Sequence, residues 1–460
     1  MPNTETTPVA IVGAGPVGLA AAAHVLARGI DCVILEAGPT VGIAPRAWGH
    51  VRMFSPWRYN IDAATRALLE SQGWQAPDPD KFSTGAELAA DYLEPLSLTP
   101  AIAKRLHLKT RVTAITRAGL DKVRGGGRED APFEIRLEQD GRETRLFANA
   151  VIDASGTWGR HNPAGASGVP ALGERAIAHL IRYGMPDVLG AEQAHYAGRR
   201  TLVVGTGHSA IGTIVDLCTL TTGARETEVF WASRTGDLTR TYGGGAADQL
   251  PERAALGQHL KRLVTTGAVT VLAPFAVDAT QETADGRIEV IGRDGQREQV
   301  IQVDQLVVAT GLRPDLSILS ELRLDLDPAL ECPSALGPLI DPNIHSCGTV
   351  RPHGAFELAQ PEPGLFIAGM KSYGRAPTFL LATGYEQVRS IAAFLANDIE
   401  AARRVDLDLP QTGVCSSNPV SAFAETCCAP KAQECGMLAP ATAACCGRTS
   451  TKEIEPGPSV

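Results

Sequence analysis

Two glycine-rich turns carry the clearest chemical signal in this sequence. Gly13, Gly15 and Gly18 form a G-x-G-x-x-G pattern, and Pro16 stands between the last two. Glycines at this spacing permit a tight turn, let the backbone approach a pyrophosphate and let a helix pack closely on a strand. Free N–H groups at the start of such a helix favour anions. The pattern predicts a dinucleotide site, with a purely structural turn as the alternative.

A carboxylate stands where a dinucleotide site would need one. We expect an apolar strand at residues 8–12, a helix from the glycines to about Arg28, and a second strand over residues 32–35 that ends at Glu36. In this order of elements the acidic residue accepts hydrogen bonds from ribose hydroxyls. The three elements therefore place Glu36 in the same site as the glycines.

A second turn of the same kind begins about 190 residues later. Gly205, Gly207 and Ala210 form a G-x-G-x-x-A pattern that also contains Ser209. The expected strand at residues 201–204 precedes it. A second dinucleotide site is therefore predicted, again with a helix N-terminus facing the phosphates.

The strand that follows the second turn ends differently from its counterpart in the first unit. A helix is expected to about Leu220 and a strand over residues 228–232, which is followed by Arg234 and not by a carboxylate. An arginine pairs with the 2′-phosphate of NADPH, whereas a carboxylate would repel it. We therefore expect NADPH in preference to NADH. The alternative is a solvated Arg234, under which either cofactor would bind.

Further segments complete two units of this type. Buried strands are expected at residues 150–154, 305–310 and 364–368, a long helix at about 378–396, and antiparallel strands within 133–149. Two copies of one β-α-β unit predict an α/β protein with two Rossmann-like, three-layer domains, the second inserted in the first.

Composition excludes two classes of partner. The chain has 460 residues, of which 44% are hydrophobic, so a packed core is available, and its net charge is −9, which repels nucleic acid and anionic membranes. No apolar run approaches the roughly 20 residues of a membrane span, and no export signal is recognisable. We expect a cytoplasmic protein that acts on a small molecule.

Cysteines are concentrated at the end of the chain. Residues 406–460 are rich in Pro, Ala, Ser, Thr and Cys and are expected to form an irregular tail. Six of its residues are candidate ligands for a soft metal or metalloid such as Hg(II), As(III), Cu(I) or Zn(II), because thiolates are soft ligands. These are Cys415, Cys427, Cys428, Cys435, Cys445 and Cys446. The alternative is a tail whose thiols do nothing or bind zinc adventitiously.

The two glycine turns, together with the strand ends Asp153-Ala154-Ser155-Gly156 and Ala309-Thr310-Gly311, resemble the two-dinucleotide-domain flavoproteins. This group includes thioredoxin reductase-like enzymes and flavin-containing monooxygenases, and the resemblance covers about residues 8–400. It implies FAD on the first turn and NAD(P)H on the second. It also implies an FAD-binding domain of residues 1–160 and 310–405, an NADPH-binding domain of residues 161–309, and the tail 406–460.

The resemblance extends to cofactor contacts. Residues near the cofactors would include Ser155, Gly156, Thr310 and Gly311. Residues 364–369 resemble the late FAD segment of the group, in which Gly369 is followed by an aspartate that touches the ribityl chain. Here Met370 stands in that place, so we expect Gly369 and Met370 to approach the FAD through their backbone and not through an acidic side chain.

The resemblance also indicates a branch of the group. Thioredoxin reductase types need a C-x-x-C or C-x₄-C pair, and residues 1–400 contain none. The monooxygenase branch needs no thiol, and it places residues along the flavin where this chain has Arg46–Phe54. Arg46 and Arg52 are candidates for the FAD pyrophosphate. Candidates lining the flavin are Trp48, His50, Tyr373 and Arg375. The alternative is a surface loop packed by Trp48 and Trp57.

The tail narrows the resemblance further. Cys445-Cys446-Gly447 resembles the end of mercuric reductase, and the whole combination resembles flavin monooxygenases associated with arsenic resistance. The implied activity is an FAD- and NADPH-dependent monooxygenase. It would react with O₂ through a C4a-hydroperoxyflavin and oxidise a sulfide, an amine or a trivalent arsenical. One alternative is an NADPH-dependent reductase of a thiol-bound soft metal or disulfide that uses the tail cysteines. Another is a soft-metal sequestration protein.

Overall fold

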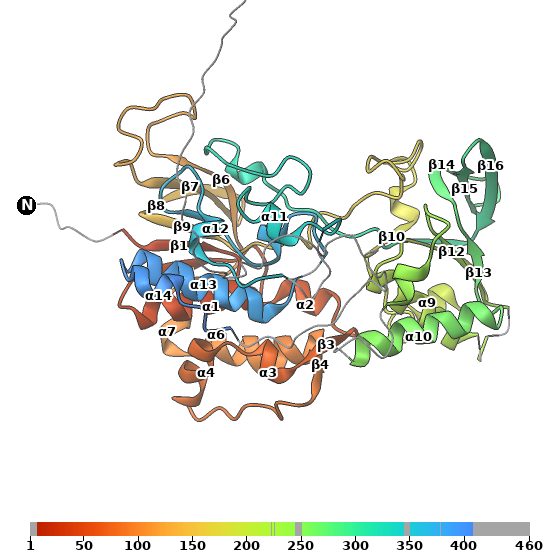
Figure 1. Ribbon diagram of the computed structural model, residues 1–460, viewed down its shortest axis with the longest axis horizontal. Coiled ribbons are helices and arrows are strands. Elements are labelled where there is room, and N and C mark those ends of the chain that lie inside the picture. Colours follow the sequence, from red (N-terminus) through yellow and green to blue (C-terminus); the bar gives the residue numbers. More distant parts are fainter. Residues whose placement is uncertain are drawn as a thin grey trace, which may run out of the picture. The chain divides into compact units, whose positions relative to one another are not determined.

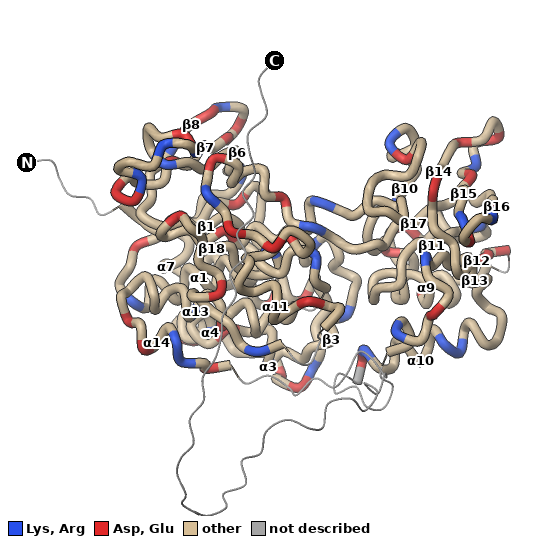
Figure 2. Tube along the Cα trace, turned by 45° about the horizontal axis from the view of Figure 1, so that its top comes forward, with Lys and Arg blue, Asp and Glu red and all other residues tan. Residues whose placement is uncertain are grey.

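The computed structural model describes residues 7–407 except 222, 225, 244–250, 345–349 and 378. Two five-stranded parallel sheets form the centres of two α/β units (Figure 1). In the described part of the chain, no helix is long and apolar enough to cross a membrane. Acidic and basic residues are interspersed along both units (Figure 2).

The first sheet has the strand order β18-β9-β1-β2-β5. Its strands are all parallel. They are β1 (Val9–Val12), β2 (Cys32–Leu35), β5 (Leu106–His107), β9 (Ala150–Asp153) and β18 (Leu365–Ile367). Chain crossovers on both sides of β1 bring the carboxyl ends of β1, β2 and β9 together at one edge of the sheet, where a ligand crevice forms in folds of this type.

The two faces of the first sheet are covered by different layers. Ile11 and Ile34 belong to a core shared with α1 (Pro16–Ala27) and α13 (Leu381–Leu395). Alternate residues such as Val12 and Val151 face a core shared with an antiparallel sheet. That sheet comprises β6 (Thr110–Arg117), β7 (Phe133–Gln139) and β8 (Arg142–Ala148). Apolar residues on both faces of each strand therefore specify a three-layer unit.

The second sheet repeats this design in the order β10-β17-β11-β12-β13. Its strands are β10 (Ile181–Tyr183), β11 (Arg200–Val204), β12 (Glu228–Ala232), β13 (Thr270–Leu272) and β17 (Gln305–Val308). Val203 and Val307 share a core with α9 (His208–Leu220) and α10 (Pro251–Thr265). The other face packs on β14 (Ala276–Glu282), β15 (Ile288–Asp294) and β16 (Arg297–Val303). The predicted fold class is confirmed, although this last antiparallel sheet was not expected.

Shorter elements fill the connections. Between β2 and β5 lie α2 (Ile43–Ala47), β3 (Arg52–Pro56), α3 (Trp57–Asn60), α4 (Ala63–Glu70), β4 (Phe82–Thr84), α5 (Gly85–Glu87), a π-helix (Leu88–Leu93), α6 (Glu94–Leu98) and α7 (Pro100–Ala103). The others are α8 (Gln193–Tyr196), α11 (Gly337–Ile340), α12 (Ala355–Leu358), α14 (Ile399–Arg403) and 3₁₀ turns at Ala178–Leu180, Thr239–Tyr242, Ser317–Leu319 and Gly369–Tyr373.

Two linkers connect the units and pair with each other in antiparallel fashion. The first follows β9 and the second follows β17, with a bridge between His161 and Leu312. The Asn162 amide donates to the Gly311 carbonyl at 2.9 Å, and the Arg313 amide donates to the Arg160 carbonyl at 3.0 Å. Both chain crossings are thereby held side by side.

Candidate functional site

The first glycine turn has the geometry that its sequence predicts. Gly13 has a φ of +97°, and a Cβ there would lie 2.9 Å from the Ala154 carbonyl oxygen. A Cβ at Gly18 would lie 2.0 Å from the Gly13 carbonyl oxygen, whereas nothing lies within 4 Å of one at Gly15. The turn is therefore closed by backbone on two sides and open at Gly15, which fits the approach of a pyrophosphate.

The helix behind this turn leaves its N-terminus available. Gly15 is the N-cap of α1 and provides no side-chain cap, and Pro16 occupies the first turn. Glu36 accepts from the Ala14 amide at 2.8 Å through Oε2 and from the Gly38 amide at 2.7 Å through Oε1. Each carboxylate oxygen keeps a lone pair. The residues present thus fit a dinucleotide, with Glu36 held at the turn and able to accept from hydroxyls.

The late segment after β18 holds an ion pair that was not predicted. Lys371 Nζ donates to Asp153 Oδ2 at 2.6 Å and to Ser155 Oγ at 3.0 Å. Both charged side chains are buried, whereas Met370 is half-buried. The residue after the unusual methionine therefore turns inward and meets the end of β9. The sequence shows only a carboxylate at the end of one apolar strand and a lysine four residues after another.

A second buried contact fixes the same segment. Gly369 has a φ of +68°, and its amide donates to Gln387 Oε1 at 2.7 Å. Gln387 Nε2 also donates to Ser372 Oγ at 2.9 Å. This glutamine of α13 was missed in the sequence, because a polar residue on a helix carries no signal of its distant partner.

Tyr373 and Arg375 have opposite environments. Tyr373 is fully buried, and its ring lies 5.3 Å from that of Phe379. Burial raises the pKa of Tyr373 well above its usual range. Arg375 is exposed and follows Gly374, whose φ is +57°. The structure does not bring these two side chains together.

The segment Arg46–Phe54 runs from the first unit to the second glycine turn. Arg46 forms an ion pair with Glu94 at 2.8 Å. At the other end the Phe54 ring lies 5.0 Å from the ring of His208, at the start of α9. Arg46 and Glu94 are both partly exposed, so this pair can exchange for another anion at little cost.

The remaining candidates of this segment are spread along it. The Arg52 guanidinium lies 5.6 Å from the centre of the Phe82 ring. Trp48 is half-buried beside Gly85, where a Cβ would lie 2.5 Å from its ring, and His50 is exposed. Trp57 is buried in the core. The roles proposed for Arg46, Trp48, His50 and Arg52 stay predictions.

The second glycine turn repeats the geometry of the first. Gly205 has a φ of +133°, and a Cβ there would lie 2.3 Å from the Ala309 carbonyl oxygen, whereas nothing lies within 4 Å of one at Gly207. Ala210 is buried and Ser209 is half-buried in the first turn of α9. Trp231 Nε1 donates to the Gly205 carbonyl at 2.7 Å. This turn also fits a dinucleotide.

Arg234 follows β12 at the edge of this turn. It is exposed, and Nη1 lies 3.5 Å from the Ala166 carbonyl oxygen. Within the described residues it forms no ion pair. Its charge is therefore free to pair with a 2′-phosphate.

The predicted strand-end residues belong to the linkers. Ser155 Oγ donates to Asp153 at 2.6 Å, and Gly156 has a φ of +72°. Thr310 Oγ1 donates to the Asn162 carbonyl at 2.9 Å, next to Gly311 with a φ of +98°. These residues hold the connection between the units in place, beside both glycine turns.

The described cysteines are single and buried. They are Cys32, Cys218 and Cys332. Burial raises the pKa of Cys32 and Cys332 to about 12 and that of Cys218 to about 11. In the described part of the chain, no group of three His, Cys, Asp or Glu residues could hold a metal ion. Cys347 and the six tail cysteines lie outside the described residues, so the predicted metal site stays a prediction.

Known proteins are similar to this chain in sequence. The family described as pyridine nucleotide-disulphide oxidoreductase matches residues 10–332. The indole-3-pyruvate monooxygenase of Oryza sativa is 27% identical over 213 residues, which cover 45% of this chain and 44% of that protein. Ferredoxin–NADP reductase 1 of Cupriavidus taiwanensis is 25% identical over 70% of this chain and 75% of its own length.

Solved structures share the fold as well. The bacillithiol disulfide reductase Bdr of Bacillus cereus superposes with a TM-score of 0.63 at 17% identity. The match covers 85% of this chain and 99% of that one. At this identity the likeness concerns the fold alone.

Proposed function

The chain belongs to the pyridine nucleotide-disulphide oxidoreductase family, and from that premise we propose that it is an FAD- and NADPH-dependent monooxygenase. Family membership confirms the predicted oxidoreductase and its two cofactors, FAD and NADP(H). What remains to be assigned is the acceptor of the electrons that leave the flavin.

One observation carries the choice of O₂ as that acceptor. The three described cysteines are buried, unpaired and held protonated by their raised pKa values, so none offers the thiolate that a disulfide relay requires. FAD, when bound, would supply the redox chemistry that carries electrons from NADPH to O₂. The similarity to an indole-3-pyruvate monooxygenase supports the same choice.

The protein's own residues then bind, orient and exclude water. The open face at Gly15 and the carboxylate of Glu36 would hold the pyrophosphate and a ribose of FAD. The open face at Gly207 and the free guanidinium of Arg234 would hold NADPH. The buried Lys371–Asp153 pair would keep the late segment fixed against the end of β9.

The proposed substrate is a soft nucleophile: a sulfide, an amine or a trivalent arsenical. The cysteine-rich tail would gather a thiophilic substrate, because neighbouring thiols on one segment raise the effective ligand concentration. This part of the proposal rests on the sequence, since the tail lies outside the described residues.

A second candidate is a reductase that passes electrons to tail thiols or to a metal bound to them. The fold likeness to a bacillithiol disulfide reductase and the name of the family favour it. It needs thiols outside the described residues, at Cys347 or in the tail, because the described ones are buried.

One experiment separates the two candidates. NADPH and O₂ consumption are measured with arsenite, a thioether and Hg(II), for the full chain and for a truncation after Leu407. That cut keeps Asp406, which pairs with Arg404 at 2.8 Å. The monooxygenase predicts substrate-dependent uptake of one O₂ per NADPH, with oxygenated product and without H₂O₂. The control is a catalase-treated reaction, which reveals uncoupled oxidation.

The reductase predicts a different pattern. Under anaerobic conditions it would oxidise NADPH in the presence of Hg(II) or a disulfide, and the truncation would lose this activity. That result would overturn the monooxygenase. Both candidates predict that the truncation retains FAD, because every proposed FAD contact lies before residue 400.

A further inference from the structure

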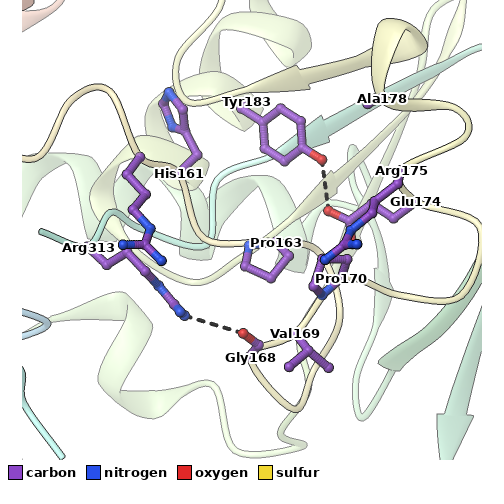
Figure 3. A pocket seen from close by; sticks show the side chains of 11 residues that line it. His161, Pro163, Gly168, Val169, Pro170, Glu174, Arg175, Ala178, Tyr183 and Arg313 are labelled. Atoms are coloured by element: carbon purple, nitrogen blue, oxygen red, sulfur yellow. Dashed lines mark hydrogen bonds between the residues drawn. The ribbon is translucent and has the colours of Figure 1, made fainter. Parts of the chain in front are cut away.

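A cavity of about 430 Å³ lies beside the carboxyl ends of β10 and β17, between the two linkers and the loop 163–175 (Figure 3). Neither glycine turn contributes to its lining. Three arginines line it from three separate segments. Arg160 comes from the first linker, Arg313 from the second and Arg175 from the loop before the Ala178–Leu180 turn.

The one carboxylate in the lining is already fully used. Glu174 is 1% exposed. Its Oε1 accepts from the Ala164 amide at 2.9 Å and from the Tyr183 hydroxyl at 2.8 Å, and Oε2 accepts from the Ala171 amide at 2.7 Å. Glu174 thus holds the walls together and leaves no direct partner for the arginines. Figure 3 shows Tyr183 reaching it across the cavity wall.

Two of the three guanidinium groups form no ion pair within the described residues, and the third has one distant, largely solvent-exposed partner. Among the described residues, the side chain of Arg313 donates to two neutral acceptors, Asn162 Oδ1 at 2.7 Å and the Gly168 carbonyl at 3.3 Å. The nearest carboxylate of Arg160 is Asp315, at 4.0 Å and largely in solvent. Arg175 is exposed and forms no ion pair within the described residues. Desolvation lowers the pKa of His161, so the arginines carry the positive charge at neutral pH.

A fourth arginine, Arg375, lies close to the same loop. A Cβ at Gly168 would lie 3.6 Å from Arg375 Nη2 and 4.0 Å from Arg313 Nη2. Gly168 therefore lies close to the guanidinium group of Arg313, on the second linker, and to that of Arg375, which follows the 3₁₀ turn Gly369–Tyr373. Such a concentration of like charge is unfavourable unless an anion relieves it.

Pro163, Val169, Pro170 and the ring of Tyr183 form an apolar part of the lining, which would contact the apolar part of a ligand. Val169 is 61% exposed. A large apolar side chain left exposed beside arginines with little or no charge compensation is typical of a binding site. The matching ligand has an anionic head and a small apolar body.

We propose that this cavity binds a small organic anion whose carboxylate or phosphate group is held by Arg160, Arg175 and Arg313 while its apolar body lies on Tyr183 and the prolines. The proposal goes beyond the monooxygenase activity, because it adds a second ligand site. Since Arg160 and Arg313 lie on the two paired linkers, a bound anion would bridge both connections between the units.

The site is tested on the full-length, flavin-loaded protein by titration calorimetry in a phosphate-free buffer of low ionic strength. The probes are phenyl phosphate, benzoate and neutral benzamide, with inorganic phosphate as the bare anion. We expect one phenyl phosphate or benzoate to bind per chain with a Kd below about 1 mM, weakening with added salt, and benzamide not to bind. Comparing the two aromatic anions identifies which head group is preferred.

Variants assign the binding to this cavity. Arg175→Gln should weaken it at least about tenfold, the loss expected for one charge-assisted hydrogen bond. Arg313→Gln should weaken it as well. Arg199→Gln, which removes an exposed arginine of the same unit outside the cavity, is the matched control and should bind normally. Flavin content and melting temperature show that each variant is folded.

Three results would overturn the proposal. The first is the absence of saturable anion binding. The second is unchanged affinity in Arg175→Gln. The third is competitive displacement of the probe by NADP⁺, which would assign the cavity to the nicotinamide site, since Arg234 contacts the same loop at Ala166. Binding without turnover keeps these results independent of the monooxygenase test.

Discussion

Lys371 Nζ lies 2.6 Å from Asp153 Oδ2, in a pair whose side chains are 1% and 0% exposed. The two residues are 218 positions apart. The contact joins the end of β9 to the 3₁₀ turn after β18, beside the linker that begins at Ser155. Lys371 directly follows Met370, and Met370 is the position at which the resemblance led us to look for an aspartate.

Breaking this pair on one side should destabilise the protein strongly. Lys371→Met leaves Asp153 buried without its counter-charge, a change that costs about 3–5 kcal/mol. Urea unfolding followed by fluorescence measures the loss. The double variant Asp153→Asn/Lys371→Met is the control, and it should recover most of the stability because neither charge remains. A single variant as stable as the wild type would contradict this account.

The glycines of each turn should separate folding from cofactor binding. Gly15→Ala places a methyl group in open space, so we expect a folded protein that has lost FAD. Gly18→Ala places one 2.0 Å from the Gly13 carbonyl oxygen, so we expect loss of both stability and FAD. Flavin absorbance and thermal denaturation by circular dichroism give the two readouts. Equal FAD content in Gly15→Ala and wild type would count against the site.

The same logic applies to the second turn. Gly207→Ala should retain FAD and melt normally, because nothing lies within 4 Å of the added Cβ, while its KM for NADPH rises. Gly205→Ala should be unstable, because its Cβ would lie 2.3 Å from the Ala309 carbonyl oxygen. Stopped-flow reduction of the flavin by NADPH measures the first effect.

Arg234 should determine the choice between the two nicotinamide cofactors. Arg234→Gln is expected to raise the KM for NADPH about tenfold, through loss of a charge-assisted bond to the 2′-phosphate, and to leave NADH unaffected. Arg199→Gln serves as the control for loss of a surface charge in the same unit. Equal effects on NADPH and NADH would contradict the assignment.

Asp216 of α9 should make stability depend on pH. Burial raises its pKa to about 6, with His50 lowering it and Asp187 raising it. In the unfolded chain the carboxyl has a pKa of about 4, so between pH 4 and pH 6 the native state binds the proton more tightly than the unfolded state does. The native state therefore loses stability as the pH rises from about 4 through 6. Partial solvent exposure reduces the size of this effect.

Asp216→Asn removes that titration. We expect its free energy of unfolding, relative to wild type, to increase between pH 4 and pH 6 and then to level off. Urea unfolding of both proteins across this range is the measurement. A constant difference between them would show that the Asp216 carboxyl titrates alike in the folded and unfolded states.

The buried cysteines should be chemically silent in the native protein. Their raised pKa values suppress the thiolate that reacts with alkylating and disulfide reagents. Iodoacetamide labelling followed by peptide mass spectrometry should therefore find Cys32, Cys218 and Cys332 unmodified before denaturation and modified after it. Rapid labelling of any of these cysteines in the native protein would show a reactive thiolate in the described chain, and it would favour a thiol relay.

The sequence by itself determined the local framework. The expected strands at residues 32–35 and 228–232 have the same bounds as β2 and β12, and α9 ends at Leu220 as expected. Two glycine patterns at known spacing placed both turns. These features are local, because side-chain period, glycine φ values and helix starts depend on residues within a few positions of each other. The bounds moved at α13, which begins at Leu381 and not near residue 378.

Only the tertiary structure decided which distant side chains meet. Neither the approach of Lys371 to Asp153 nor the gathering of Arg160, Arg175 and Arg313 around one cavity has a periodic signature in the sequence. Both follow from the strand orders, which bring β18 beside β9 and β10 beside β17, and from the antiparallel linkers. The sequence does not distinguish a solvated charged residue from one in an ion pair, because the environment of the side chain is set by chain segments that lie far away in the sequence.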